Sequence, residues 1–191
     1  MKEDKDLIAE VIAGDTRAFA GLVTRYQHMV FTLAVQILRN RELAEEAAQD
    51  VFVKAYRGLS KFKGEAKFST WLYRIVYRHF LDIARVALRQ PKFVQDKVPE
   101  IWTEKSLDDI WTQLIKRERS ELLQKLLDTL PVQDRACLTL HYLQEQSLEE
   151  IAAISGCSTN SVKVRLFRAR ERLKSLMQLS LNGKILEEYE R

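Results

Sequence analysis

The sequence predicts an all-α fold of two small helical domains joined by a linker. Its 191 residues include only six glycines and three prolines, too few for the closely spaced turns that β-strands need. Long stretches rich in Ala, Leu, Glu, Lys, Arg and Gln run without a helix-breaking residue. Charge is segregated along the chain. Residues 54–92 carry ten basic and two acidic residues, whereas residues 94–134 carry six basic and nine acidic, which indicates separate surfaces for separate partners.

The first domain is expected over residues 1–90 and contains three helices. Apolar residues recur at spacings of three and four over residues 19–38, which predicts one long amphipathic helix. A turn at residues 39–41 precedes a second helix over about 42–59, whose acidic beginning suits the positive end of a helix dipole. After a loop around Gly64, a third helix begins at Ser69 or Thr70 and ends near Arg89, because Pro91 stops it.

A linker is expected over residues 91–110, which contain two prolines and no clean periodicity. The second domain then covers residues 111–178. A leucine-rich stripe over residues 115–130 predicts its first helix, and Pro131 opens the next one. Residues 179–191 form a C-terminal tail that is expected to fray.

A helix-turn-helix, a motif that reads duplex DNA, is predicted within the second domain. Ser147 and Glu150 have the spacing of a capping box, Gly156 occupies the turn, and Ser158 caps the last helix. The expected buried stripe of that last helix is Val162, Leu166, Ala169 and Leu173.

Two basic segments point to DNA. Residues 61–85 contain six basic and six aromatic residues against two acids, a combination that arises from core packing or from base stacking beside phosphate neutralisation. Residues 158–174 carry six basic residues against one acid, on the helix after the turn. Together the two segments indicate one DNA engaged at two places.

Membrane insertion, disulfides and metal binding are not expected. Charges interrupt the N-terminal segment, and no later stretch has the apolar length of a membrane span, so a cytoplasmic location is predicted. Cys137 and Cys157 offer no disulfide framework, and both are expected to be packed thiols. Cys137 and His141 share a helical face, but two ligands do not make a zinc site.

An enzymatic function is not expected either. The three histidines are widely separated, and acidic pairs such as Glu45 and Glu46 point to different helical faces. No glycine-rich loop ends in Gly-Lys-Ser or Gly-Lys-Thr. We therefore assign no catalytic residue, no cofactor and no small-molecule substrate.

Four segments in this order resemble the extracytoplasmic-function (ECF, group 4) sigma factors, small subunits of the sigma-70 family that give bacterial RNA polymerase its promoter specificity. The segments span most of residues 19–176, and their ordered combination is highly specific. They are AEEAAQDVFVKAY at 44–56, FKGEAKFSTWLYRI at 62–75, LPVQDRACLTLHYLQEQSLEEIAAISG at 130–156 and SVKVRLFRARERL at 161–173.

The resemblance implies that the second helix docks on the core RNA polymerase. Seen in isolation, this helix also fits a solvated acidic face with packed aromatics. The positions that match the docking residues of the family are Glu46, Gln49, Asp50, Phe52 and Tyr56.

The resemblance also implies that the loop and third helix capture the non-template strand of the minus-10 promoter element and nucleate melting. Phe62, beside a glycine in a charged loop, is the better stacking candidate, whereas Trp71 at the helix start suits the core. The matching positions are Phe62, Lys63, Gly64, Phe68, Trp71, Arg74 and Arg78.

For the minus-35 element, the resemblance implies recognition by the last helix. Asn160 and Ser161 are candidates for phosphate contact in its first turn. The positions expected to contact DNA are Asn160, Ser161, Lys163, Val164, Phe167 and Arg168.

Three positions depart from the family pattern. Arg78 stands where relatives commonly carry Asn, and because Arg offers only hydrogen-bond donors it favours phosphate or a guanine edge. Phe80 replaces a small residue. Val164 stands where a small polar residue is common, so it favours apolar contact with a thymine methyl group.

The family commonly answers to an anti-sigma factor and controls stress-responsive or signal-responsive genes, so an anti-sigma partner is expected. The main alternative is an autonomous helix-turn-helix regulator whose first domain senses a ligand or dimerises. Only the sigma-factor interpretation explains the basic and aromatic loop beside an acidic helix. Capture of core polymerase by residues 1–90 alone separates the two, because a sensor domain should fail that test.

Overall fold

The computed structural model describes residues 2–87 and 123–189, with side chains in the last helix to Leu179. Within these ranges every regular element is a helix, which confirms the all-α prediction. The predicted linker at residues 91–110 and the start of the second domain lie outside the described residues.

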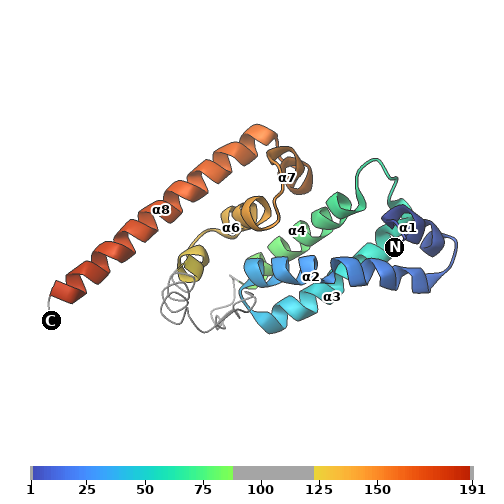
Figure 1. Cartoon of the computed structure of the whole chain (residues 1–191), viewed down its shortest axis with the longest axis horizontal. Coiled ribbons are helices and arrows are strands. Elements are labelled where there is room, and N and C mark those ends of the chain that lie inside the picture. Colours follow the sequence, from blue (N-terminus) through green and yellow to red (C-terminus); the bar gives the residue numbers. More distant parts are fainter. Residues whose placement is uncertain (1, 88–122, 190–191) are drawn as a thin grey trace, which may run out of the picture.

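The first lobe contains α1 (Asp4–Ile12), α2 (Phe19–Leu38), α3 (Arg41–Gly58) and α4 (Phe68–Ala87), with short 3₁₀ turns at Thr16–Ala18 (η1) and Leu59–Lys61 (η2). In Figure 1, α2, α3 and α4 lie side by side with α1 at one end. The predicted turn is confirmed, because Arg39 adopts a left-handed conformation with φ 59°. Asn40 then caps α3, accepting a hydrogen bond from the Leu43 N–H at 2.7 Å.

The sequence patterns did not predict α1. This helix is joined to α2 by Asp4, which pairs with Arg25 and accepts a hydrogen bond from the Tyr26 hydroxyl. Leu7 of α1 is buried, and a Cβ at Gly21 of α2 would lie 3.1 Å from the Leu7 Cδ1. A residue without a side chain therefore lets α1 approach α2 closely.

The second lobe contains a helical segment at residues 123–128, α6 (Val132–Leu138), a π-helical turn η4 (Thr139–Leu143), α7 (Leu148–Ser155) and α8 (Thr159–Tyr189). The predicted capping box is present, with the Glu150 N–H donating to Ser147 Oγ at 3.1 Å and the Ser147 N–H donating to Glu150 Oε2 at 2.9 Å. Gly156 ends α7 with φ 72°, which favours glycine. The Ser161 N–H donates to Ser158 Oγ at 3.2 Å, so Ser158 caps α8 as predicted.

The last helix is longer than the sequence predicted. Residues 179–191 were expected to fray, but α8 remains helical to Tyr189 and extends beyond the rest of the lobe (Figure 1). Leucine, lysine and glutamate, which are good helix formers, dominate this extension and outweigh the single glycine at Gly183.

The core runs through both lobes as one set of buried apolar side chains. Phe80 and Leu72 of α4 are 0% exposed. In α8, Val162, Leu166 and Ala169 are buried as predicted, whereas Leu173 is only partly buried. Helix α4 contacts α7, and α2 contacts α6, so the lobes pack against each other (Figure 1).

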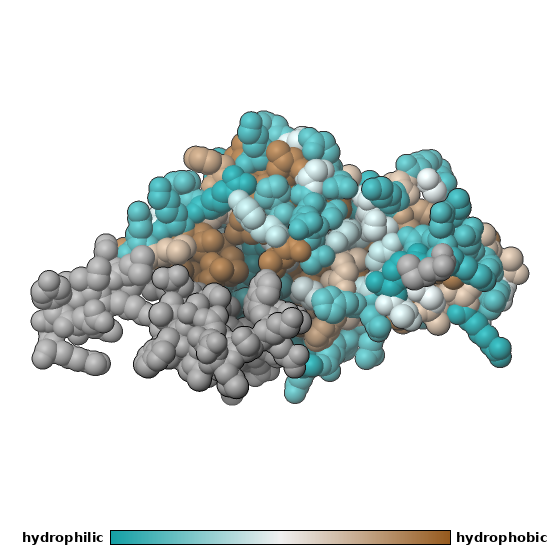
Figure 2. Space-filling view, in the orientation of Figure 1, coloured by the Kyte–Doolittle hydropathy of each residue, from teal (hydrophilic) through white to brown (hydrophobic). Residues whose placement is uncertain are grey.

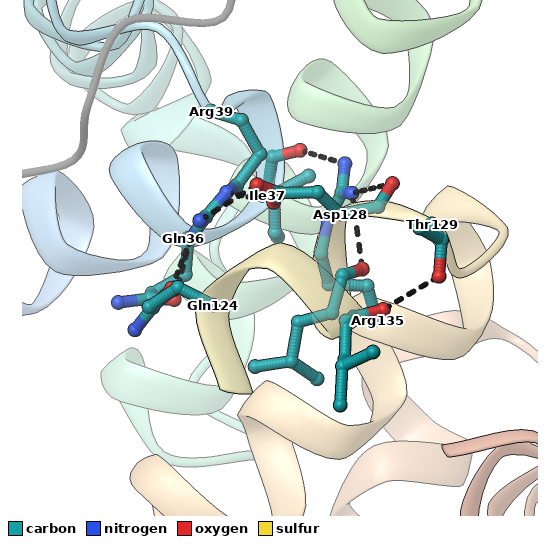
Figure 3. Close-up of polar contacts among 9 residues, drawn as sticks. Gln36, Ile37, Arg39, Gln124, Asp128, Thr129 and Arg135 are labelled. Carbon is teal, nitrogen blue, oxygen red and sulfur yellow. Dashed lines mark hydrogen bonds and ion pairs between the residues drawn. The ribbon is translucent and has the colours of Figure 1, made fainter. Parts of the chain in front are cut away.

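Three charged residues meet where the lobes join, and we call them the inter-lobe joint: Arg39, Asp128 and Arg135. Arg39 follows α2, and its guanidinium pairs with Asp128 of the second lobe. Arg135 of α6 donates from Nη2 to the Ile37 carbonyl oxygen at 2.7 Å (Figure 3). The joint therefore ties the end of α2 to two segments of the second lobe.

Replacing Phe80 with alanine should lower the free energy of unfolding by about 3–5 kcal/mol, because it removes a fully buried ring and leaves a cavity. Urea denaturation followed by circular dichroism measures this loss. Val86→Ala is the control, since Val86 lies on the same helix but is exposed. Equal stability of the two variants would contradict a core role for Phe80.

Candidate polymerase-binding and DNA-binding surfaces

The predicted docking residues share the outer face of α3. Its inner stripe of Ala48, Val51 and Ala55 is buried, which leaves acidic and amide side chains in solvent. Glu46, Gln49 and Asp50 are exposed, Tyr56 is 42% exposed, and Phe52 is half-buried. The Tyr56 ring meets Phe19 edge-to-face with centroids 5.1 Å apart.

His79 of α4 supports this face from behind. Its Nε2 lies 3.3 Å from Asp50 Oδ2. Burial lowers the pKa of His79, and Lys54 lowers it further, while Asp50 acts in the opposite direction. The ring is therefore largely neutral near pH 7, so it forms no ion pair with Asp50, whose side chain lies on the exposed face of α3.

Three of the predicted minus-10 residues form an aromatic cluster at the start of α4. The ring centroids of Phe62, Phe68 and Trp71 lie 5.4–5.8 Å apart, a spacing typical of packed aromatic rings. Phe68 is 4% exposed, whereas Phe62 and Trp71 are half-buried. The cluster thus anchors the loop through Phe68 and leaves part of the other two rings in solvent.

The loop itself presents Lys63 and Gly64 to solvent. Gly64 has φ 74°, so a side chain there would strain the backbone even though the surrounding space is open. The structure therefore places a basic side chain and a tight turn directly beside the partly exposed Phe62 ring.

The structure separates the two predicted arginines of α4. Arg74 donates from Nε to the Ala153 carbonyl oxygen of α7 at 2.8 Å and is partly buried. Arg78, one turn further on, is exposed and lines a groove between α4 and the second lobe together with Arg85 and Arg165. Of the two, Arg78 is therefore the one that is exposed and has no hydrogen-bond or ion-pair partner among the described residues, so it can meet a phosphate in this arrangement of the lobes.

All six predicted minus-35 residues are exposed on α8, facing away from the buried stripe. Phe167 is 62% exposed, which is unusual for a phenylalanine in a helix that packs on a core. Figure 2 shows other hydrophobic residues at the surface near α6 and α7, among hydrophilic ones. On α8 itself, the exposed face combines apolar Val164 and Phe167 with basic Lys163 and Arg168, which suits thymine methyl groups and phosphates in a major groove.

Sequence reasoning missed the residue that fixes this helix. Asp134 of α6 is 6% exposed and pairs with Arg172, and its other oxygen lies 3.5 Å from Arg165 Nη1. Arg165 also donates to Gln133 Oε1 at 2.6 Å. The seven-residue spacing of the two arginines puts them on one face of α8, which was the available signal.

The expectation of two packed thiols is wrong for Cys157. Cys137 of α6 is buried, but Cys157 follows Gly156 in the turn and is exposed. His141 Nδ1 lies 3.0 Å from the Gln146 carbonyl oxygen. Across residues 2–87 and 123–189, no three His, Cys, Asp or Glu side chains gather as metal ligands, and no helix there is long and apolar enough to span a membrane.

The two thiols should differ in reactivity at pH 8. Burial raises the pKa of Cys137 to about 11, so its thiol stays protonated and shielded, whereas Cys157 is open to reagent. Titration with a disulfide reagent should give one fast thiol, and the second only after unfolding. Cys157→Ser should abolish the fast phase, and a fast phase that survives this change would contradict the assignment.

Comparison with known proteins places both lobes in one family. The model for sigma-70 region 2 matches residues 22–90, and the model for sigma-70 region 4 matches residues 120–173. The RNA polymerase sigma-H factor of Pseudomonas aeruginosa is 33% identical over 183 residues, covering 93% of this chain and 95% of the relative. The ECF RNA polymerase sigma-E factor of Escherichia coli is also 33% identical, covering 92% and 94%.

Solved structures share the fold at lower identity. RpoE of Bartonella quintana, solved with the anti-sigma factor NepR, has a TM-score of 0.68 at 23% identity and covers 85% of this chain and 98% of its own. CnrH, solved with the cytosolic domain of CnrY, has a TM-score of 0.66 at 24% identity and covers 92% and 97%. Because the sequence relatives exceed 30% identity over nearly the whole length, this chain belongs to the sigma-70 family of RNA polymerase sigma factors, as a factor of the extracytoplasmic-function type.

Proposed function

We propose that this sigma factor binds core RNA polymerase through the exposed face of α3, captures the minus-10 strand with the loop before α4, and reads the minus-35 element with α8. The observation that carries the proposal is the exposed face of α8, where every residue expected to contact DNA is in solvent. The aromatic cluster with Lys63 supports strand capture, and the acidic α3 face supports docking.

The functional division follows the expected domain boundaries. Residues 1–90 serve polymerase binding and minus-10 melting, residues 91–110 connect the domains, and residues 111–178 serve minus-35 recognition. Helix α8 continues to Tyr189, and we assign the C-terminal tail at residues 179–191 no contact with polymerase or promoter.

Strand opening in this scheme is driven by binding. Stacking a base on an aromatic ring contributes about 1–3 kcal/mol, and breaking one duplex step costs about 1.4 kcal/mol on average. Capture of one or two flipped bases therefore offsets only a few broken steps. The chain nucleates melting, while polymerase extends the bubble and performs all catalysis. We accordingly infer a non-enzymatic subunit that needs no cofactor and no small-molecule substrate.

The chain acts in the cytoplasm, where polymerase and promoter DNA are found, and it is regulated by an anti-sigma factor. The similar structures of RpoE with NepR and of CnrH with the cytosolic domain of CnrY support this kind of control. The genes whose promoters this sigma factor recognises form a regulon that responds to a stress or to another signal. Arg78 and Val164 favour, respectively, a phosphate or guanine edge and a thymine methyl group.

Phe62→Ala should reduce promoter opening more than closed-complex binding, because the ring stacks on a base only after the strand separates. We expect opening to fall about 5- to 150-fold, corresponding to about 1–3 kcal/mol of stacking. Permanganate footprinting measures opening, and mobility shift at low temperature measures closed-complex binding. Tyr142→Ala removes an exposed aromatic ring of the second lobe and serves as the control. Equal losses in both assays would argue against strand capture by Phe62.

Arg168→Ala should weaken binding to a minus-35 duplex, because it removes a cation from the DNA-facing side of α8. The expected cost is about 1–3 kcal/mol, measured by fluorescence anisotropy at physiological salt. Arg41→Ala removes an exposed arginine from the first lobe and should leave this affinity unchanged. An unaltered affinity for Arg168→Ala would remove this residue from the interface.

A further inference from the structure

The inter-lobe joint buries two positive charges against one negative charge. Arg39 is 4% exposed and Arg135 is 6% exposed. Arg39 donates from Nη2 to Asp128 Oδ2 at 3.1 Å, and its Nη1 also donates to Gln124 and Gln36, as Figure 3 shows. Among the described residues, Asp128 is the carboxylate that pairs with Arg39, and it belongs to the opposite lobe.

The balance of charge makes this joint sensitive to Asp128. Burial, and next the nearby charge of Arg39, lower the pKa of Arg135 to about 10, while Asp128 acts in the opposite direction. The guanidinium of Arg135 remains charged near pH 7, so loss of the Asp128 carboxylate would leave the two buried arginines without a carboxylate partner among the described residues. Such an uncompensated charge is strongly unfavourable.

A second contact zone lies between α4 and the helix-turn-helix. The Tyr73 hydroxyl donates to Gln144 Oε1 at 2.9 Å, and Arg74 donates to the Ala153 carbonyl oxygen at 2.8 Å. Tyr73 is buried there. Arg74 therefore directs its guanidinium into the second lobe, although it is one of the proposed minus-10 contacts.

The closed arrangement affects the two DNA surfaces differently. Arg74 is occupied by a carbonyl oxygen of α7, so the minus-10 surface is incomplete while the lobes are closed. The DNA-facing side of α8 points to solvent, with Lys163, Phe167 and Arg168 exposed. The minus-35 surface is therefore complete before any movement.

We propose that the face of α4 bearing Tyr73 and Arg74 is a shared binding surface, which the second lobe occupies in the free chain and promoter single strand occupies after the lobes separate. The inter-lobe joint holds the closed arrangement. This inference rests on the proposed role of α4 in strand capture. When only a fraction of molecules is open, the apparent affinity for the strand is reduced by that fraction.

Asp128→Asn in the full chain tests the inference, because the amide keeps the size of the side chain and removes its charge. We expect a larger radius of gyration by small-angle X-ray scattering. Affinity for a fluorescent minus-10 single-stranded oligonucleotide should rise by about tenfold or more, as the open fraction increases. Affinity for a minus-35 duplex should stay unchanged, which also establishes that the second lobe remains folded.

Two further variants complete the design. Glu10→Gln neutralises a partly exposed carboxylate of α1 that pairs with Lys2, far from the joint, and it should change none of the three measurements. Tyr73→Phe removes the hydroxyl that donates to Gln144 and leaves the buried ring in place. It should shift the radius and the strand affinity in the same direction as Asp128→Asn, but less.

The outcomes separate this inference from the proposed function. An Asp128→Asn chain with the radius of the unmodified chain overturns the role of the joint. An expanded chain that binds the oligonucleotide with unmodified affinity overturns occlusion of the α4 surface and leaves strand capture standing. If neither the unmodified chain nor the Asp128→Asn chain binds the oligonucleotide, the proposal that α4 captures the strand is wrong, and so is the proposal of a shared surface.

Discussion

The buried pairing of Arg39 with Asp128 is the constraint on which the relative position of the two lobes depends. Arg39 lies at the left-handed turn that ends α2, so the turn that shapes the first lobe also supplies the guanidinium that holds the second. Arg135 adds a bond from α6 to the carbonyl end of α2, where backbone oxygens lack helical partners. Two requirements, ending a helix and joining two lobes, are met at one place in the fold.

Helix α4 serves three purposes. Its inner face supplies Leu72 and Phe80 to the core, and its first turn holds the aromatic cluster. Another face carries Tyr73 and Arg74, which contact the second lobe. Since a helix repeats every 3.6 residues, neighbouring residues in sequence necessarily point to different partners. Residues with different roles are consequently interleaved along α4, and their roles follow from their positions around the helix.

The sequence predicted the elements whose signals are local. The turn at Arg39, the Ser147–Glu150 capping box and the left-handed Gly156 depend on residues within a few positions of one another, and the structure confirms each. Helix α1 escaped prediction because it is short and rich in charge, and it is held by Asp4 contacts to residues about twenty positions away. The positions of the docking and DNA-binding residues in the sequence came from the family resemblance, and the structure adds their exposure.

The inter-lobe joint could not be predicted, because no local pattern signals it. Asp128 lies 89 residues from Arg39, and Arg135 lies 98 residues from Ile37. Each arginine taken alone fits an ordinary exposed surface residue, since arginine is rarely buried without a partner. Only the fold brings them together. For the same reason the sequence did not predict that Arg74 donates to a backbone carbonyl oxygen of α7, because no local pattern specifies such a contact.

The charge of α8 must be counted with its partners in the structure. Six basic residues lie between Ser158 and Lys174, and their number alone suggests strong, unspecific attraction to phosphate. Asp134 pairs with Arg172 and lies beside Arg165, on the side of the helix that faces α6. These two cations stabilise the orientation of α8, which leaves Lys163 and Arg168 among the basic side chains of the exposed DNA-facing side. Because counterion release scales with the phosphates actually neutralised, the salt dependence of minus-35 binding reflects this smaller set, and base contacts gain relative weight.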